Sequence, residues 1–178
     1  MPTATTFKQV AQADAMWLKI LDKKVPVLHI VDVATKYQAA CVFYGEKSHD
    51  FQKALQRTWF RHFGIPSELW TDEGQGWAAD ELLGYFTNLN IKHTVSPGEA
   101  HQRIGLVERY HQVLRKAAEV SMTCQKNTTV KGLKAALAFV LPQINSQPTV
   151  AGYSPAHWVL GYQPAFPGDL LQEQINPV

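Results

Sequence analysis

The sequence predicts an α/β domain in which helices flank a five-stranded mixed sheet. Three features point to this fold class: short apolar, β-branched runs fill the first 44 residues, helical periodicity follows them, and two further short runs lie between the helices. The 178 residues are 46% hydrophobic and 18% charged, so the chain has the length and composition of one globular domain with a buried core.

Five strands are expected. The first three cover 7–20, 25–33 and 36–44, and the short connections between them predict an antiparallel meander. The second run is rich in β-branched residues, which favours a buried strand. The other two strands are expected at 67–72 and 91–96, each after a helix, as in crossover units.

Five helices are expected where apolar residues recur every three or four positions. They cover 47–64, 77–90, 104–123, 129–145 and 153–161. Three strands, then alternating helices and strands, then further helices is the element order of the ribonuclease-H-like architecture.

Residues at the helix ends refine these boundaries. Ser48 is expected to cap the first helix and Ser154 the last, because serine oxygens accept hydrogen bonds from free helix N–H groups. Pro142 is expected to kink its helix or end it early. No linker divides the chain, so residues 1–165 form one predicted domain and residues 166–178, with their prolines, a predicted extended tail.

Composition limits the partners. A net charge of +2 permits a polyanionic partner without requiring one. No run approaches 18 uninterrupted apolar residues, so no membrane partner is expected. Cys41 and Cys124 lie in apolar segments, which predicts two reduced core cysteines and an intracellular setting.

Three acidic residues lie at positions that secondary-structure preferences alone do not explain. Asp14 lies mid-strand, Asp72 ends the fourth predicted strand, and Glu108 lies early in a helix. Taken singly, a strand-end aspartate is commonly a turn residue, and such a glutamate commonly complements the helix dipole. If the three converge, their mutual repulsion demands cations, and two Mg²⁺ ions about 4 Å apart are the arrangement that supports phosphoryl transfer.

The chain resembles the catalytic core of retroviral and long-terminal-repeat retrotransposon integrases, most of all the gypsy-like elements. The similar segments are "VAQAD", "HIVDVATKYQAA", "GIPSELWTDEGQGW", "HQRIGLVER" and "GYSPAHWVLGYQPAFP", in the family's order. The family separates its last two acids by 35 residues, and 108 − 72 = 36 leaves the same 35 here. The resemblance covers the core alone, so we expect an excised core or a degenerate element.

The resemblance implies a set of catalytic residues. Asp14, Asp72 and Glu108 would be both the catalytic acids and the ligands of two Mg²⁺ (or Mn²⁺) ions, with Asp14 bridging the pair. Asp32 is the alternative for the first acid, because it also follows an apolar strand. Its other interpretation is a turn residue that precedes Lys36. The resemblance favours Asp14.

The helix that follows Glu108 is expected to bind DNA. At 100° per residue Gln112 and Arg115 share the face of Glu108, and His111 flanks it. In the family this face meets DNA ends and often carries two lysines. Here Gln112 replaces one of them, while Arg115 and Lys116 supply cations. The predicted DNA contacts are His111, Gln112, Arg115 and Lys116, which could otherwise be solvated helix residues.

Residues 96–105 are expected to form a mobile active-site loop, with Gly98, His101 and Gly105 as its characteristic residues. His101 could contact phosphate. The alternative for Gly105 is a close-packed entry into the helix.

The resulting hypothesis is a metal-dependent polynucleotidyl transferase, the core of an integrase from a retrotransposon polyprotein. It would process DNA 3′ ends as an endonuclease and join them to target DNA, as a homodimer or higher oligomer, inside the cell and in the nucleus at integration. Two alternatives stay open: a decayed or domesticated core that only binds DNA or protein, and another nuclease of the same architecture.

Overall fold

A computed structural model describes residues 4–45, 47–72, 74, 77, 79–95, 101–149 and 152–164. Within these ranges, no helix has both the length and the apolar character that crossing a membrane requires. The predicted tail, 166–178, lies outside them.

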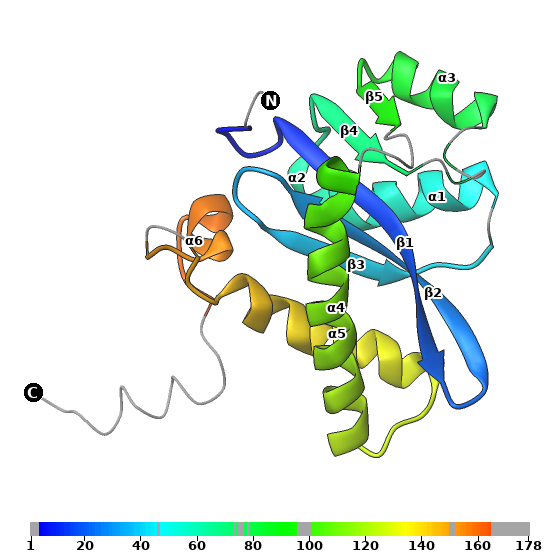
Figure 1. The fold of residues 1–178 in the computed structure, drawn as a ribbon, viewed down its shortest axis with the longest axis vertical. Helices are drawn as coiled ribbons and strands as arrows, with labels where there is room; N and C mark the ends of the chain where they lie inside the picture. Colours follow the sequence, from blue (N-terminus) through cyan, green and yellow to red (C-terminus); the bar gives the residue numbers. More distant parts are fainter. Residues whose placement is uncertain are drawn as a thin grey trace, which may run out of the picture.

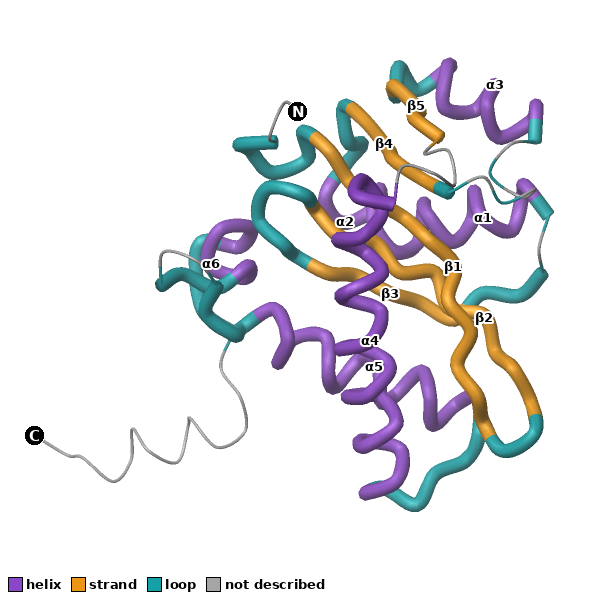
Figure 2. The backbone as a smooth tube through the Cα atoms, in the orientation of Figure 1, coloured by secondary structure: helices purple, strands orange, loops and turns teal. Residues whose placement is uncertain are grey.

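Five strands form one mixed sheet in the order β3-β2-β1-β4-β5 (Figure 2). The strands are β1 (Val10–Ile20), β2 (Lys23–Asp32), β3 (Gln38–Val42), β4 (Glu68–Thr71) and β5 (Lys92–Val95). The first three pair antiparallel, whereas β4 runs parallel to β1 and to β5. The predicted fold class is therefore confirmed, and the predicted strands differ only at their ends.

The first helical segment runs without a break from α1 (Ser48–Leu55) through a π-helical turn, η1 (Gln56–Phe60), to α2 (Arg61–Phe63). The predicted cap is wrong by one residue. Lys47 has the extended backbone of the cap position, and Ser48 is the first helical residue. The Ser48 hydroxyl instead donates to Glu81 Oε2 over 2.6 Å, which joins α1 to α3 (Asp80–Asn88).

Three helices complete the described fold: α4 (His101–Cys124), α5 (Val130–Asn145) and α6 (Pro155–Leu160). The predicted cap of the last one is confirmed, because Ser154 Oγ accepts from the His157 N–H over 3.2 Å. This helix ends at Gly161, whose φ of 78° favours a residue without a side chain. Cys124 was expected in the core but is exposed, because it is the last residue of α4.

The prediction that Pro142 kinks or ends α5 early is wrong about the end, because the helix continues to Asn145. Proline removes one helix hydrogen bond, but the last turn is held from outside the helix. Asn145 accepts from the Gln38 N–H and donates to the Gln38 carbonyl, both over 2.8 Å. These two bonds fasten the end of α5 to the edge strand β3.

The sheet separates two apolar cores. Ala11, Ala13 and Leu28 pack with residues of α1 and α3 on one face. Met16 and Leu18 pack with residues of α4 and α5 on the other, and Figure 1 shows α4 lying across that face. Because side chains alternate along a strand, the even-numbered residues of β1, Asp14 included, point to the α4 side.

Candidate active site

Asp14 lies near the middle of β1 and pairs across the sheet with His29. Its side chain is 17% exposed, and its Oδ1 accepts from the Ala15 N–H over 2.6 Å. Burial, the largest cause, and then the negative charge of Asp72 raise the pKa of Asp14 to about 7. The Ala15 N–H opposes this, and the charge of Glu108 raises the pKa further.

Asp72 follows the last residue of β4 and is half-buried. Its Oδ1 accepts from the Gly74 N–H over 3.1 Å, which closes a small turn at the strand end. A Cβ on Gly74 would lie 3.0 Å from that same oxygen, so the close turn favours glycine at position 74. The turn orients Asp72 next to β1, with which β4 pairs.

Glu108 is exposed on α4, one residue after a point of attachment to the sheet. The Val107 N–H donates to Gln12 Oε1 on β1 over 3.2 Å. Gln12 and Asp14 lie two residues apart on the same face of β1. This contact therefore brings the Glu108 turn of α4 beside Asp14.

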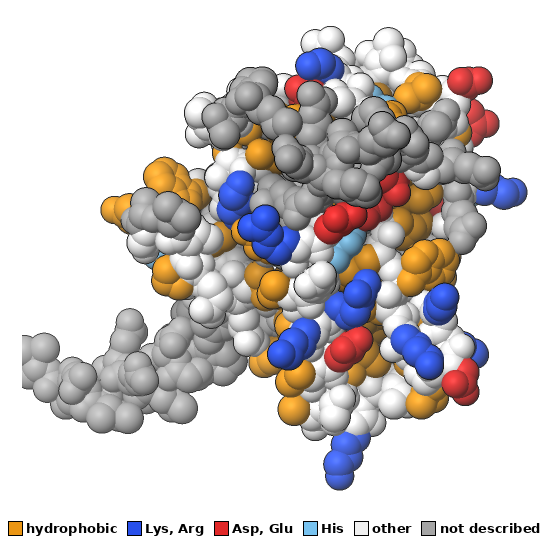
Figure 3. Space-filling view, in the orientation of Figure 1, with side chains coloured by type: hydrophobic (Ala, Val, Ile, Leu, Met, Phe, Trp, Pro, Cys, Tyr) orange, Lys and Arg blue, Asp and Glu red, His pale blue; other side chains and the backbone are white. Residues whose placement is uncertain are grey.

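Asp14 is close enough to the other two predicted catalytic acids for the negative charges of Asp72 and Glu108 each to raise its pKa. On the face seen in Figure 3, acidic side chains gather near the middle of the molecule, with lysine and arginine side chains around them. The three acids come from β1, the end of β4 and α4, which are remote in sequence.

Asp32, the alternative first acid, is fully buried in a structural turn. Its Oδ1 accepts from the Thr35 N–H and hydroxyl over 2.7 and 2.8 Å. Its Oδ2 accepts from the Lys8 N–H over 3.0 Å. Both oxygens are occupied by these donors, so Asp32 has the geometry of a turn residue.

The donor chemistry of the three acids fits Mg²⁺ or Mn²⁺. Carboxylate oxygens are the ligands these hard cations prefer, and a cation would offset both the burial and the neighbouring negative charges that raise the pKa of Asp14. No three His, Cys, Asp or Glu side chains of the described residues converge on one ion. A two-ion arrangement would need fewer protein ligands for each ion. Asp14 and one further acid would suffice, with the remaining oxygens from water and substrate.

His111 lies elsewhere than its predicted DNA-facing position. It is 7% exposed, and its Nδ1 lies 3.7 Å from Asp14 Oδ2. Burial, and to a lesser degree the charge of Arg115, lower the pKa of His111 to about 4. The imidazole is therefore neutral at pH 7, so this contact is not an ion pair. Helix geometry explains the difference, because position i+3 turns from the Glu108 face towards the sheet.

His29, which the sequence did not single out, lies behind His111. It is fully buried, and burial, followed by the neighbouring His111, lowers its pKa to about 3. A histidine within an otherwise apolar strand run is the sequence signal that could have identified it.

The other predicted DNA contacts on α4 have different exposures. Gln112 and Lys116 are exposed, and Arg115 is half-buried. All three follow Glu108 along the helix, and Lys116 also borders the groove between α4 and α5. Of the predicted loop residues, Gly98 lies outside the described residues.

The prediction that His101 and Gly105 belong to an active-site loop is wrong, because α4 begins at His101. Glycine inside a helix costs only about 1 kcal/mol, so Gly105 does not interrupt the helical hydrogen bonding.

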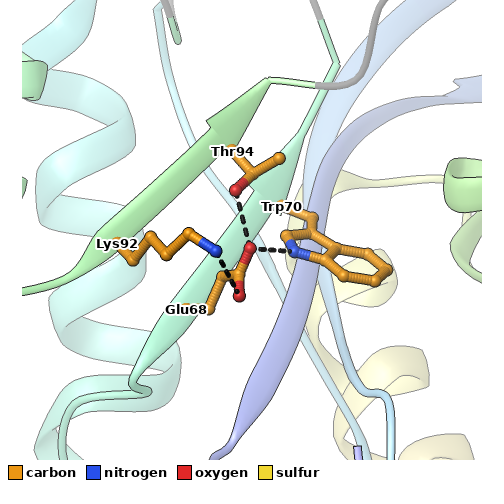
Figure 4. Close-up of polar contacts among 4 residues, drawn as sticks. All are labelled: Glu68, Trp70, Lys92 and Thr94. Carbon is orange, nitrogen blue, oxygen red and sulfur yellow. Dashed lines mark hydrogen bonds and ion pairs between the residues drawn. The ribbon is translucent and has the colours of Figure 1, made fainter. Parts of the chain in front are cut away.

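A polar network connects β4 and β5, the two strands at one side of the sheet (Figure 4). Trp70 Nε1 and Thr94 Oγ1 each donate to Glu68 Oε1 over 2.7 Å, and Lys92 Nζ donates to Glu68 Oε2 over 3.3 Å. Burial acts to raise the pKa of Glu68, but these hydrogen bonds and the charge of Lys92 outweigh it and lower the pKa. The network ties β5 to β4, the strand that Asp72 follows.

Solved structures share this arrangement of elements. A chain of the simian T-cell lymphotropic virus intasome, in complex with the PP2A regulatory subunit B56 gamma, aligns with a TM-score of 0.81 and 22% identity. The alignment covers 94% of this chain and 60% of that one. The catalytic core domain of HTLV-2 integrase, in a trimeric form with magnesium, aligns with a TM-score of 0.75 and 18% identity over 86% of this chain and 97% of that one.

This chain has the fold of a retroviral integrase catalytic core. The catalytic core domain of BIV integrase also aligns, with a TM-score of 0.71 and 20% identity over 86% of this chain and 95% of that one. No family profile matches the sequence, and no curated protein does. The integrase-core fold thus rests on the three-dimensional arrangement of β1–β5 and the flanking helices.

Proposed function

We propose that this chain is the metal-dependent polynucleotidyl transferase core of a retrotransposon integrase. The observation that carries the proposal is the coupling of Asp14 to both Asp72 and Glu108 within an integrase-core fold. The resemblance of its motifs to gypsy-like elements supports the retrotransposon and polyprotein origin. The setting we propose is intracellular, and nuclear at the integration step.

The proposed reaction is phosphodiester exchange in two stages. Water first cleaves a P–O bond near the end of the element DNA and frees a 3′ hydroxyl. That hydroxyl then attacks a target phosphodiester, so that one P–O bond forms as another breaks. Two divalent cations, when bound, supply charge stabilisation at the attacking and leaving oxygens.

The side chains divide this work. Asp14, Asp72 and Glu108 are the residues that would hold the cations, with Asp14 contributing to both. A metal ligand must be ionised, so a proton that the raised pKa retains on Asp14 would have to leave on cation binding. The hydrogen bond between Asp72 and the Gly74 N–H fixes the end of β4. The bond from the Val107 N–H to Gln12 fixes α4. Both contribute to catalysis by orienting the reacting groups.

DNA is the proposed partner along α4. Gln112, Arg115 and Lys116 follow Glu108 on the helix and can donate to phosphate oxygens, which set the register of the DNA on the protein. Only part of the intasome chain is matched, so contacts made by other domains lie beyond this proposal.

Self-association is the second proposed partnership. The HTLV-2 core was solved in trimeric and dimeric forms. Here β3 is an edge strand, and a groove between β3 and α5 is lined by Ala39, Cys41, Ala138, Leu141 and Pro142, among others. An apolar groove beside the edge strand of the sheet suits a second copy of this chain.

A strand-transfer assay tests the proposal. Purified protein is given an element-end duplex, a target duplex and Mg²⁺ or Mn²⁺, beside matched Asp72→Asn and Glu108→Gln variants. We expect joined products from the wild type alone. A wild type that binds DNA without joining in either metal would establish a decayed binding module. Cleavage confined to RNA–DNA hybrids would establish a nuclease of the same fold.

A further inference from the structure

A chain of buried polar side chains leads from Asp14 into the protein interior. The His111 ring lies against the His29 ring, with centroids 5.1 Å apart and planes 33° from parallel. His29 Nε2 lies 3.1 Å from Gln38 Oε1. The backbone of Gln38 is in turn held by Asn145 through two bonds of 2.8 Å. The chain therefore joins α4, β2, β3 and α5 behind one acid.

Burial and hydrogen bonding limit which ring nitrogen of His29 and of His111 carries the proton. Both are buried, and His111 Nε2 and His29 Nδ1 are buried without a hydrogen-bond partner. The amide oxygen of Gln38 can only accept, so His29 carries its proton on Nε2. If His111 carries its proton on Nδ1, facing Asp14, both unpartnered nitrogens are bare lone pairs. A buried lone pair costs less than a buried unpaired N–H group.

The carboxyl group of Asp14 has a nitrogen neighbour at each oxygen. Oδ1 accepts from the Ala15 N–H, and Oδ2 faces His111 Nδ1 at 3.7 Å. That separation is longer than a hydrogen bond, and contacts in apo active sites often shorten when the complex assembles. Rotation of the Asp14 carboxyl group would break one contact or the other.

We propose that His111 is a positioning residue for Asp14, with its Nδ1–H directed at Oδ2 and its ring fixed from behind by His29 and Gln38. This inference rests on the proposed function of Asp14 as a shared ligand. It assigns His111 to the carboxylate and not to DNA, because a side chain with 9% exposure presents little surface to a phosphate.

The first test needs no variant. Nitrogen-15 NMR of the histidine rings in the folded protein distinguishes the two neutral tautomers. We expect His111 with its proton on Nδ1 and His29 with its proton on Nε2. A spectrum that places the His111 proton on Nε2 would overturn the proposal.

The second test uses substitutions and metal binding without catalysis. Mn²⁺ affinity is measured by electron paramagnetic resonance, and DNA affinity by fluorescence anisotropy without metal. We expect His111→Leu to weaken Mn²⁺ binding about 10-fold to 100-fold, as losses of supporting hydrogen bonds do, with DNA affinity unchanged. His111→Asn should restore most of the Mn²⁺ affinity, because its amide N–H₂ lies near the place of Nδ1.

Ser121→Ala is the matched control, since Ser121 is another buried polar residue of α4, away from Asp14. It should leave both affinities unchanged. Weaker DNA binding with unchanged Mn²⁺ binding in His111→Leu would contradict the inference. If that variant does not fold, the His111→Asn comparison and the NMR result still decide it. A wild type that binds Mn²⁺ but joins no DNA would refute the proposed function alone.

Discussion

At the scale of single residues, Asp14 and Asp32 have opposite surroundings. Asp32 is buried, yet every oxygen of its carboxylate meets donors from the backbone or Thr35. Asp14 is less buried than Asp32, but its burial, together with the charges of Asp72 and Glu108, raises its pKa to about 7. A carboxylate that satisfies a turn stabilises the fold, whereas one that faces like charges is held at a cost in stability and suits a cation.

The pKa of Asp14 leads to a prediction about stability and pH. The folded protein binds a proton at Asp14 up to about pH 7, whereas the unfolded chain releases it near 3.8. The metal-free protein should therefore lose stability from this group as the pH rises from about 4 to 7. Asp14→Asn removes the loss, which is at most about 4 kcal/mol for a pKa shift from 3.8 to about 7, and should raise the Tm at pH 8 by at least roughly 4 °C.

Thermal unfolding between pH 4 and 8 in the presence of EDTA measures this effect. Asp22→Asn, in the exposed turn between β1 and β2, is the control and should follow the wild type. Added Mg²⁺ should stabilise the wild type and not Asp14→Asn. Parallel pH curves for the wild type and Asp14→Asn would refute the raised pKa.

Asp32→Ala separates the two candidate first acids. The change leaves the N–H groups of Lys8 and Thr35 without their acceptor and should cost roughly 2–4 kcal/mol in the free energy of unfolding. Urea unfolding measures the loss. Mn²⁺ affinity of the folded fraction should stay at the wild-type value, and its abolition would make Asp32 the metal ligand.

At the scale of elements, the site depends on how helices are fastened to the sheet. The hydrogen bond from the Val107 N–H to the Gln12 side chain fixes α4 beside β1. The two hydrogen bonds between the Asn145 side chain and the Gln38 backbone fix α5 to β3. In each contact the amide group of one side chain forms hydrogen bonds with backbone atoms of another element. Such bonds set the position of a helix more narrowly than apolar packing, which has no direction.

Asn145→Ala tests this fastening. It leaves the buried N–H and carbonyl of Gln38 unpaired and should destabilise the protein by about 2–3 kcal/mol. Chemical denaturation measures the cost, and hydrogen exchange should show earlier opening of β3. Lys131→Ala, at the exposed start of α5, is the control and should change stability by less than about 0.5 kcal/mol. A loss for Lys131→Ala as large as that for Asn145→Ala would refute the fastening.

At the scale of the whole molecule, electrostatics should govern DNA binding. The net charge is only +2, so attraction to DNA must come from local cations beside the acids, as Figure 3 shows on one face. We expect Arg115→Gln to weaken binding to unrelated DNA sequences alike and to lower the slope of log Kd against log salt by about 1.

Fluorescence anisotropy across a salt series measures that slope. Lys24→Gln is the matched control, because Lys24 is an exposed cation at the start of β2, in the hairpin far from α4's first turns (Figure 1). Equal slopes for Arg115→Gln and the wild type would remove Arg115 from the DNA interface.

The sequence by itself determined the element order and the ribonuclease-H-like class, because periodicity is a local property of a chain. Motif spacing also indicated three candidate acids, with Asp32 open as an alternative for the first. Errors arose where the deciding partner is remote. Pro142 did not end its helix, because β3 holds the following turn.

Only the tertiary structure decided between Asp14 and Asp32 as the acid that faces other acids, and only it turned His111 away from the solvent. Both outcomes depend on which atoms lie within a few ångströms, such as the donors around Asp32 and the His29 ring behind His111. Those neighbours come from other strands and helices, so no window of sequence contains them. Pairing chemistry and burial are properties of the assembled fold, and with them the pKa values that make a carboxylate structural or reactive.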